Sequence, residues 1–203
     1  MKQAVILAHP APDSLNAAIA EAYAAAAREH GHDVVVRDLY RMGFDPRLKA
    51  EEIPGPSAPK FAADVLAERT KLADVDVFVF VYPLWFNAPP AILKGYVDRV
   101  FGMGFGFKPD LGGSEPALRG RGLLSFTTSG APDFWLRDTG ALETLKRSFD
   151  AHLAGVTGLD VLDHVHFGGM VAGVSRETVD GVLAQVRGAA ARLGLQHSPA
   201  DAG

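Results

Sequence analysis

Cysteine is absent from this chain of 203 residues. Its absence excludes disulfide bonds, thiol nucleophiles and thiolate metal sites. A cluster of lysine and arginine residues is missing too, and the formal net charge is −4. A nucleic-acid partner is therefore not expected, because binding phosphates needs a positively charged face.

Long apolar runs and leader-like segments are also missing. No stretch approaches the roughly 20 apolar residues of a transmembrane helix. Met1-Lys2-Gln3 leads directly into a short apolar run, without the longer apolar region and cleavage site of a signal peptide. We therefore expect a cytoplasmic protein with no transmembrane segment.

Neither of the two best-known phosphate-binding loops occurs, since GxGxxG and GxxxxGK[ST] are both absent. The 7 histidines show no spacing that predicts a ligand set, and we expect no metal site. His164 and His166 alternate along a predicted strand, and we interpret them as a solvent-facing pair.

The composition that remains is that of an ordinary globular protein, with 48% hydrophobic and 22% charged residues. The length favours a single domain, which we place at residues 1–196. Residues 197–203 are expected to form a disordered tail.

The most informative stretch is residues 75–90. Its first part, VDVFVFV, is β-branched and aromatic, and it predicts a strand buried on both faces of a parallel sheet. The following YPLWFNAPP places aromatic rings at the carboxyl end of that strand, where ligands bind in open α/β sheets. A planar, aromatic ligand is the first expectation.

Four other strands are predicted along the chain, and helices alternate with all five. The other strands lie at residues 4–8, 34–36, 122–126 and 159–167, and the helices at residues 17–29, 61–73, 90–100, 141–153 and 175–193. Right-handed crossovers between such strands predict an α/β fold with a doubly wound five-stranded parallel sheet in the order 2-1-3-4-5 and helices on both faces.

Under this order, the loops after the first, third and fourth strands open on one crevice. Residues 9–16 supply helix-capping side chains and suit an anion, although a capped helix without a ligand is an alternative. Residues 83–88 supply rings, and residues 127–130 supply hydroxyl groups and a flexible backbone. Together, the three loops predict a site for a heteroaromatic ring.

Three segments are predicted to be irregular. Residues 41–59 contain too many breakers for a regular element, and we expect them to pack across the sheet edge or a subunit partner. Residues 101–109, FGMGFGFKP, suit a mobile loop that lays rings over a pocket; a turn with its phenylalanines in the core is the alternative. Residues 135–140 are predicted to form a further loop.

These features resemble the flavodoxin-like NAD(P)H:quinone oxidoreductases of the DT-diaphorase type. The matching motifs follow the family's order and spacing over most of the chain. They are Ala8-His9-Pro10 with Ser14-Leu15-Asn16, Asp38-Leu39-Tyr40 with Phe44-Asp45-Pro46, Pro83-Leu84 continuing into Pro90-Ala91-Ile92-Leu93-Lys94-Gly95, Asp98-Arg99-Val100-Phe101, Phe105-Gly106-Phe107 and Thr127-Thr128-Ser129-Gly130.

The resemblance implies a flavodoxin-like fold and a flavin-dependent oxidoreductase. A bound FAD, or alternatively FMN, would carry a hydride from NAD(P)H to a quinone or similar flat acceptor in ping-pong fashion. Family members are generally homodimers whose active sites are shared between subunits. Phe105 and Phe107 would then form part of the acceptor pocket.

The resemblance also implies a set of cofactor contacts around the phosphate region, the isoalloxazine, its pyrimidine end and, for Asp98, the adenosine part. The residues are His9, Ser14, Leu15, Asn16, Pro83, Leu84, Trp85, Phe86, Asn87, Asp98, Thr127, Thr128, Ser129, Gly130 and Trp135.

The chain departs from the family pattern in two places. Trp85 comes one position early, so Phe86 takes the position of the family's tryptophan and is a candidate catalytic contact. The family's best-known members carry a tyrosine and a histidine after the Thr-Thr-Gly-Gly loop, as a relay for charge on the reduced flavin. Residues 134–141 contain neither, and Arg137 is the candidate to stabilise that charge.

Two other functions are compatible with the same fold. The first is an accessory or regulatory flavoprotein subunit of a potassium efflux system. The second is a one-electron carrier, which the mild net charge disfavours. The choice between NADH and NADPH and the identity of the acceptor stay open.

Overall fold

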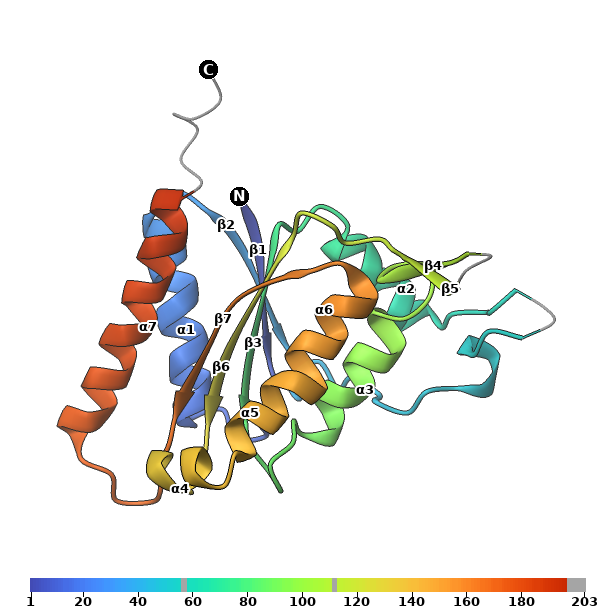
Figure 1. Ribbon diagram of the computed structural model, residues 1–203. Coiled ribbons are helices and arrows are strands. Elements are labelled where there is room, and N and C mark those ends of the chain that lie inside the picture. The colour runs from blue at the N-terminus through green and yellow to red at the C-terminus, as the bar shows by residue number, and fades with distance from the viewer. Residues whose placement is uncertain (56–57, 111–112, 197–203) are drawn as a thin grey trace.

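The computed structural model describes residues 1–55, 58–110 and 113–196. Five parallel strands form one sheet in the order β2-β1-β3-β6-β7, which confirms the predicted 2-1-3-4-5 order of the core strands (Figure 1). These strands are β1 (Lys2–Leu7), β2 (Asp33–Asp38), β3 (Val77–Pro83), β6 (Gly122–Thr128) and β7 (Asp160–Phe167). The tail expected at residues 197–203 lies outside the described residues.

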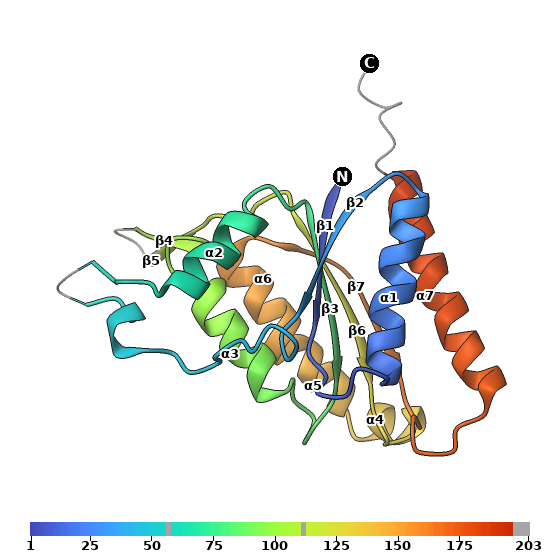
Figure 2. The same cartoon turned by 180° about the vertical axis from the view of Figure 1, so that it is seen from behind.

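Helices cover both faces of the sheet, as the sequence predicted (Figures 1 and 2). One face carries α1 (Leu15–Glu29) and α7 (Arg176–Gln196). The other carries α2 (Ala63–Leu72), α3 (Ala91–Val100) and a run made of α5 (Ala141–Leu145), the π-helical turn η2 (Lys146–Ala151) and α6 (His152–Thr157). The short α4 (Asp133–Asp138) lies at the edge towards which the strand arrows point.

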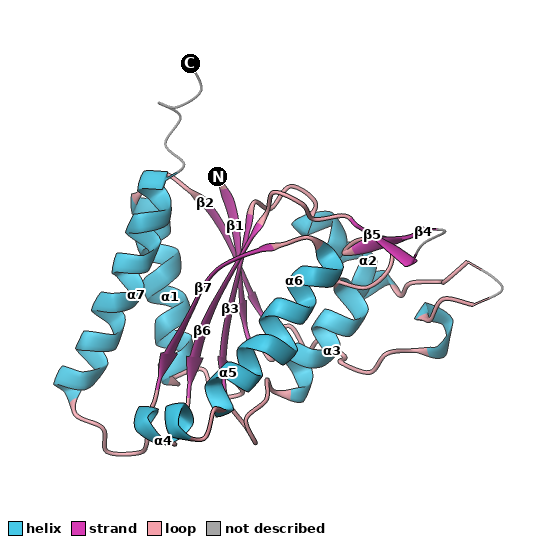
Figure 3. Cartoon of the chain, viewed as in Figure 1, coloured by secondary structure: helices cyan, strands magenta, loops and turns pink. Residues whose placement is uncertain are grey.

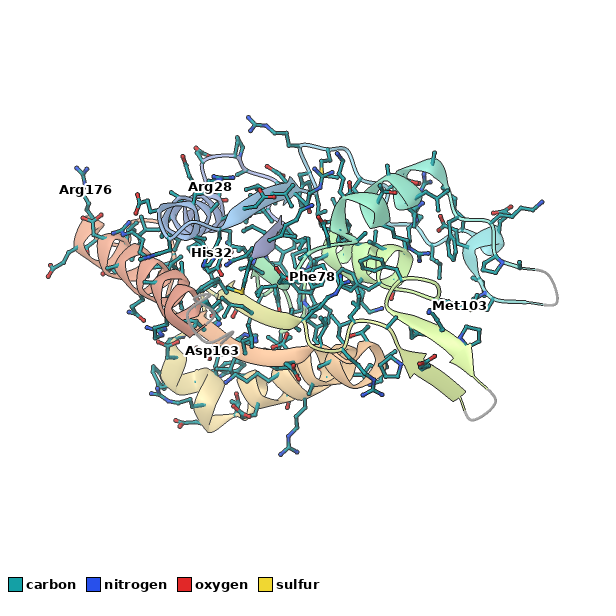
Figure 4. The ribbon with its side chains drawn as sticks, turned by 90° about the horizontal axis from the view of Figure 1, so that it is seen from above. Arg28, His32, Phe78, Met103, Asp163 and Arg176 are labelled. Atoms are coloured by element: carbon teal, nitrogen blue, oxygen red, sulfur yellow. The ribbon has the colours of Figure 1, made fainter. Side chains whose placement is uncertain are left out.

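Strand β3 is the centre of the molecule, and all seven of its residues are buried. Val77, Val79 and Val81 pack towards α1 and α7, whereas Phe78, Phe80 and Tyr82 pack into the opposite core. Figure 4 shows Phe78 between the two helix layers. The predicted strand buried on both faces is confirmed. Its apolar residues stabilise the fold by roughly 1.5–3 kcal/mol for each fully buried large side chain.

The segment between β2 and α2 packs against α3, and it contains one short 3-10 helix, η1 (Ala50–Glu52), where no regular element was expected. Gly95 on α3 permits this contact, because a Cβ atom there would lie 2.1 Å from the carbonyl oxygen of Pro46. Arg99, with a fully buried guanidinium, donates to Glu52 at 2.8 Å and to Asp64 at 2.7 Å. The hydrogen bonds from Arg99, helped by the backbone N–H groups of Lys49 and Ala62, lower the pKa of Glu52 to about 2 against the opposing effect of burial.

The glycine-phenylalanine segment differs from the prediction that it forms no strand. Part of it is β4 (Phe107–Asp110), which pairs antiparallel with β5 (Gly113–Pro116) apart from the main sheet (Figure 3). The Phe105 ring packs edge-on against Phe78 and Phe101, with centroids 6.5 and 5.7 Å apart. Phe105 is therefore partly buried against the core, which is close to the alternative that the sequence had left open.

Arg99 offers a test of what holds the segment between β2 and α2. We expect Arg99→Met to lower the free energy of unfolding by about 3 kcal/mol, because the buried Glu52 carboxylate loses its partner. Urea unfolding at neutral pH measures this change. Arg47→Ala is the matched control, since it removes the solvent-exposed Arg47–Asp45 pair, and little change is expected. Equal effects of the two substitutions would contradict the role given to Arg99.

Candidate functional site

Three loops meet at the carboxyl edge of the sheet and enclose a cavity of about 270 Å³. They follow β1, β3 and β6, which are neighbours in the sheet, so their ends meet at one place. The residues that line the cavity are His9, Ser14, Leu15, Asn16, Pro83, Leu84, Trp85, Thr128, Ser129, Gly130 and Met170. Sequence reasoning missed Met170, which follows β7 and carries no polar or motif signal.

The first loop presents hydrogen-bond donors to the crevice. Ser14 caps α1, and its hydroxyl oxygen accepts the Ala17 N–H at 3.2 Å. His9 Nδ1 lies 3.1 Å from the Ala11 amide nitrogen and 3.3 Å from the Ala11 carbonyl oxygen, so the backbone of this loop holds the ring in place. The His9 ring, the Ser14 hydroxyl and the positive end of α1 suit a phosphate group.

Asn16 carries an unpaired acceptor at the crevice. Its side chain is buried, and Nδ2 donates to the Thr128 hydroxyl at 2.9 Å. Oδ1 has no hydrogen-bond partner. A buried acceptor left in this state costs about 1–3 kcal/mol, so the site favours a ligand that donates a hydroxyl or N–H group here.

The aromatic loop makes a tight, strained turn. Trp85 and Ala88 exchange two backbone hydrogen bonds of 3.1 Å, and the two residues between them have positive φ angles of 51° for Phe86 and 55° for Asn87. This is a type I′ turn, which favours asparagine or glycine at both central positions. Asn87 suits the turn and is anchored by a 3.0 Å hydrogen bond to the Ala141 carbonyl oxygen. Phe86 is strained, and its ring is fully exposed at the tip.

The polar wall of the site continues into the protein as a hydrogen-bonded ladder between β6 and β7. Thr127 Oγ1 lies 2.9 Å from His164 Nε2 and 2.8 Å from His166 Nδ1. His166 Nε2 lies 3.0 Å from Ser129 Oγ, and His164 Nδ1 contacts the buried Asp150 carboxylate. The interpretation of the two histidines as a solvent-facing pair is therefore wrong, because only 2% and 3% of their side-chain surfaces are exposed.

A β-bulge in β7 decides which side chains join this ladder. Leu123 pairs with Val161 and Leu124 pairs with Asp163, which leaves Leu162 as an extra residue. The shift places His164 opposite Ser125 and His166 opposite Thr127, on the face covered by η2. A strand continued without the bulge would have presented its other side chains there.

Burial also determines the protonation state of His166. It lowers the pKa of His166 to about 4, because the charged imidazole loses its hydration; His164 and Lys146 act in the same direction and Asp133 opposes them. His166 is therefore neutral at neutral pH.

Besides Phe86, Asn87 and Thr127, five candidate residues do not line the cavity. Trp135 and Arg137 stand on α4, which replaces the predicted loop, and both side chains are exposed. Asp98 pairs with Lys94 at 2.6 Å and lines a separate groove of about 330 Å³ together with Phe107. That groove lies on the face of the sheet that carries α3 and α6.

Phe105 and Phe107 lie towards the end of the sheet that is opposite the crevice. Phe105 contacts Phe78 near the amino end of β3, about 17 Å along the strand from Pro83. The β4–β5 hairpin accordingly lies at the end of the sheet opposite the strand arrowheads (Figure 1).

Comparison with known proteins shows the family of the chain. Residues 1–192 match a family model described as Flavodoxin-like fold. The chain belongs to this flavodoxin-like family. A relative in Haemophilus influenzae, named an uncharacterized NAD(P)H oxidoreductase, is 32% identical over 83% of this chain and 84% of its own length.

Two further comparisons indicate which members of this family the chain resembles. A ribosyldihydronicotinamide dehydrogenase [quinone] of Mus musculus is 32% identical over 68% of this chain and 67% of its own length. The solved structure of an NAD(P)H:quinone oxidoreductase from Methanothermobacter marburgensis superposes with a TM-score of 0.79 at 28% identity, covering 95% of this chain and 96% of that one. The resemblance to the flavodoxin-like NAD(P)H:quinone oxidoreductases is confirmed, and these relatives give no support to a potassium-efflux subunit.

In the part of the chain that the structure describes, no helix is long and apolar enough to cross a membrane. The same ranges hold no group of three or more histidine, aspartate or glutamate side chains arranged to bind a metal ion.

The strained turn generates a stability prediction. We expect Phe86→Asn to raise the free energy of unfolding by about 1 kcal/mol, because asparagine tolerates positive φ and the exposed ring makes no core contact. Thermal or urea unfolding measures the gain. Phe134→Asn removes another exposed ring, from α4, where φ is helical, and no gain is expected there. A loss of stability in Phe86→Asn would show that the turn is not strained.

His166 generates a pH prediction. Its folded-state pKa of about 4 lies below the unfolded value of 6.5, so only the unfolded state binds a proton between these two pH values. Lowering the pH from 7 to 4.5 should therefore reduce the free energy of unfolding of the natural chain by about 2 kcal/mol more than that of the His166→Gln variant. Urea unfolding at both pH values measures the difference, with the exposed His30→Gln as control. Parallel pH curves would contradict a neutral, buried His166.

Proposed function

We propose that this chain is a flavin-dependent NAD(P)H oxidoreductase that reduces quinones or similar flat acceptors. The unpaired Asn16 Oδ1 carries the proposal, because it is a buried acceptor that needs a donor from a ligand. It lies in one cavity with the aromatic ring of Trp85 and with the phosphate-type donors of the first loop. The quinone-reducing relatives support the same function.

The residues of the crevice fit a flavin in three groups. His9 and Ser14, with the amino end of α1, would hold the phosphate, and Asn16 Oδ1 would accept a ribityl hydroxyl. Leu84 and Trp85 would stack against the ring system, with Phe86 closing over it from the tip of the turn.

The third group faces the polar edge of the ring. Thr128, Ser129 and Gly130 line the cavity, whereas Thr127 points into the ladder and supports this wall from behind. A bound flavin would supply the chemistry, accepting a hydride from NAD(P)H and passing it to the acceptor that next occupies the same place. The protein's part is to bind and orient the two substrates, to exclude water and to hold protons.

A second cavity supports FAD over FMN. It measures about 340 Å³, is lined by His9, Pro10, Pro12, Asp38, Tyr40 and Arg41, and shares His9 with the first cavity. The half-exposed Tyr40 ring and the Arg41 guanidinium offer stacking and a positive charge to the adenosine half of a dinucleotide. Asp98 does not line this cavity but lines the groove beside Phe107.

We also propose that the protein acts as a homodimer. Phe105 and Phe107 cannot reach the crevice of their own chain, so their expected place in the acceptor pocket requires a second copy. The groove of about 330 Å³ beside Phe107 offers this copy a partly apolar surface. Size-exclusion chromatography with light scattering tests the proposal, and a strictly monomeric active enzyme would contradict it.

Asn16 provides a binding test. We expect Asn16→Leu to weaken the binding of FAD to the apoprotein by about tenfold or more, since a buried hydrogen bond to the ligand is worth roughly 1.4 kcal/mol. Quenching of flavin fluorescence measures the dissociation constant. Thr70→Ala, on the exposed side of α2, is the control and should bind FAD normally. Normal binding by Asn16→Leu would remove Asn16 from the flavin site.

The enzymatic function has its own test. The flavin-loaded protein should oxidise NAD(P)H when a panel of quinones is supplied, with double-reciprocal plots that are parallel for ping-pong kinetics. Flavin binding without oxidation of either nicotinamide nucleotide would contradict the enzyme and favour an accessory flavoprotein.

A further inference from the structure

The ladder described above has one end in the core and one end in the crevice. Asp150 and His164 form the inner end, and each exposes only 2% of its side-chain surface. Ser129 forms the outer end, because it both contacts His166 and lines the cavity. Thr127 joins the two histidines through a single hydroxyl oxygen. Every step along this path is a hydrogen bond between groups that exchange protons.

The hydrogen bonds can be satisfied in two opposite directions. In the first, Ser129 donates to His166, His166 to Thr127, Thr127 to His164, and His164 to the Asp150 carboxylate. In the second, His164 donates both to Asp150 and to Thr127, Thr127 donates to His166, and His166 donates to Ser129. Ser129 then donates to the Ala131 carbonyl oxygen, which lies 2.9 Å away. The second arrangement holds one more proton than the first, as a positive charge on His164.

The surroundings determine where that extra proton rests. His164 contacts the Asp150 carboxylate, which also accepts the Ser125 hydroxyl and lies near the buried Tyr82 phenol. The Asp163 side chain accepts the backbone N–H of His164.

His166 is the less favourable place for the charge. It faces His164 and Lys146, which repel a positive charge, and Asp133 at 4.0 Å, which attracts it. Burial adds to the penalty on a charged His166 ring. At His164, by contrast, the Asp150 carboxylate contacts the ring and would balance a positive charge there.

We propose that Ser129, His166, Thr127, His164 and Asp150 form a proton relay that stores one proton in the core and delivers it to a ligand in the crevice. The relay rests on the proposed function for its substrate, because a quinone needs one proton besides each hydride to become a hydroquinone. The Ser129 proton passes to the acceptor's oxygen, and His166 Nε2–H replaces it. Thr127 then reprotonates His166 Nδ1, and His164 Nε2–H reprotonates Thr127. His164 is left neutral beside the Asp150 carboxylate, and a solvent proton entering by the reverse steps restores the charge.

The ladder depends on the bulge in β7, which brings His164 and His166 into register with Ser125 and Thr127 of β6.

A pair of Thr127 variants tests the relay, because valine has nearly the shape of threonine but lacks its hydroxyl group. Thr127→Val removes the proton-passing oxygen, whereas Thr127→Ser keeps it. In the apoprotein, ¹⁵N NMR measures how fast the His164 ring N–H exchanges with solvent. We expect exchange to slow at least tenfold in Thr127→Val and to stay within twofold in Thr127→Ser. Unchanged exchange in folded Thr127→Val would overturn the relay.

The loaded enzyme provides the second measurement. The turnover number for quinone reduction should fall at least tenfold in Thr127→Val, with KM for NAD(P)H within twofold, and Thr127→Ser should restore it. If Thr127→Val slows the exchange but keeps normal turnover, the relay does not deliver its proton to the acceptor. The proposed function would stand in that case. A wild-type protein that binds flavin but reduces no quinone would overturn the proposed function, while the exchange measurement would still decide on the relay. His166→Gln, which keeps a hydrogen-bonding side chain, provides a second interruption if Thr127→Val does not fold.

Discussion

The burial of β3 on both faces is the constraint on which the rest of the structure depends. A strand without a solvent face can place functional groups only at its ends, and parallel pairing brings the carboxyl ends of β1, β3 and β6 to one edge. The capping residues of α1, the aromatic turn and the hydroxyl loop therefore meet because the core is apolar, and not because they attract one another. The strain at Phe86 is tolerated at this edge, where the rigid strand beneath over-determines the turn.

The polar ladder interrupts this apolar core. Ser125 and Thr127 lie on a face of the sheet that is otherwise occupied by rings and aliphatic side chains, and each faces a histidine across the β6–β7 pair. Buried polar groups of this kind stabilise less than apolar packing unless every member finds a partner. Here the hydrogen-bonded partners form a continuous chain that ends in the crevice. A network with a purely structural role does not require such a continuous path.

Much of the fold and part of the site could be predicted from the sequence. The VFVFV stretch and the alternation of strands and helices determine the topology. Ser14 could be placed because helix caps follow local rules, and His9 and Asn16 because they belong to the same strand-to-helix connection. The two histidines could not be placed. A one-residue bulge at Leu162 reverses which side chains face the core, and no local pattern signals it. Asp150 was missed for a related reason, since a π-helical turn interrupts the helix that carries it. Phe105 was ambiguous because glycine-rich segments have weak local preferences.

Identification of the bound chromophore tests the nature of the crevice most directly. The protein is purified as it is made in cells, and heat releases any coloured ligand for chromatography against FAD and FMN standards. A flavin site of the kind described here predicts a yellow protein that releases FAD at about one molecule per chain. A colourless protein that also takes up neither FAD nor FMN from solution would contradict it.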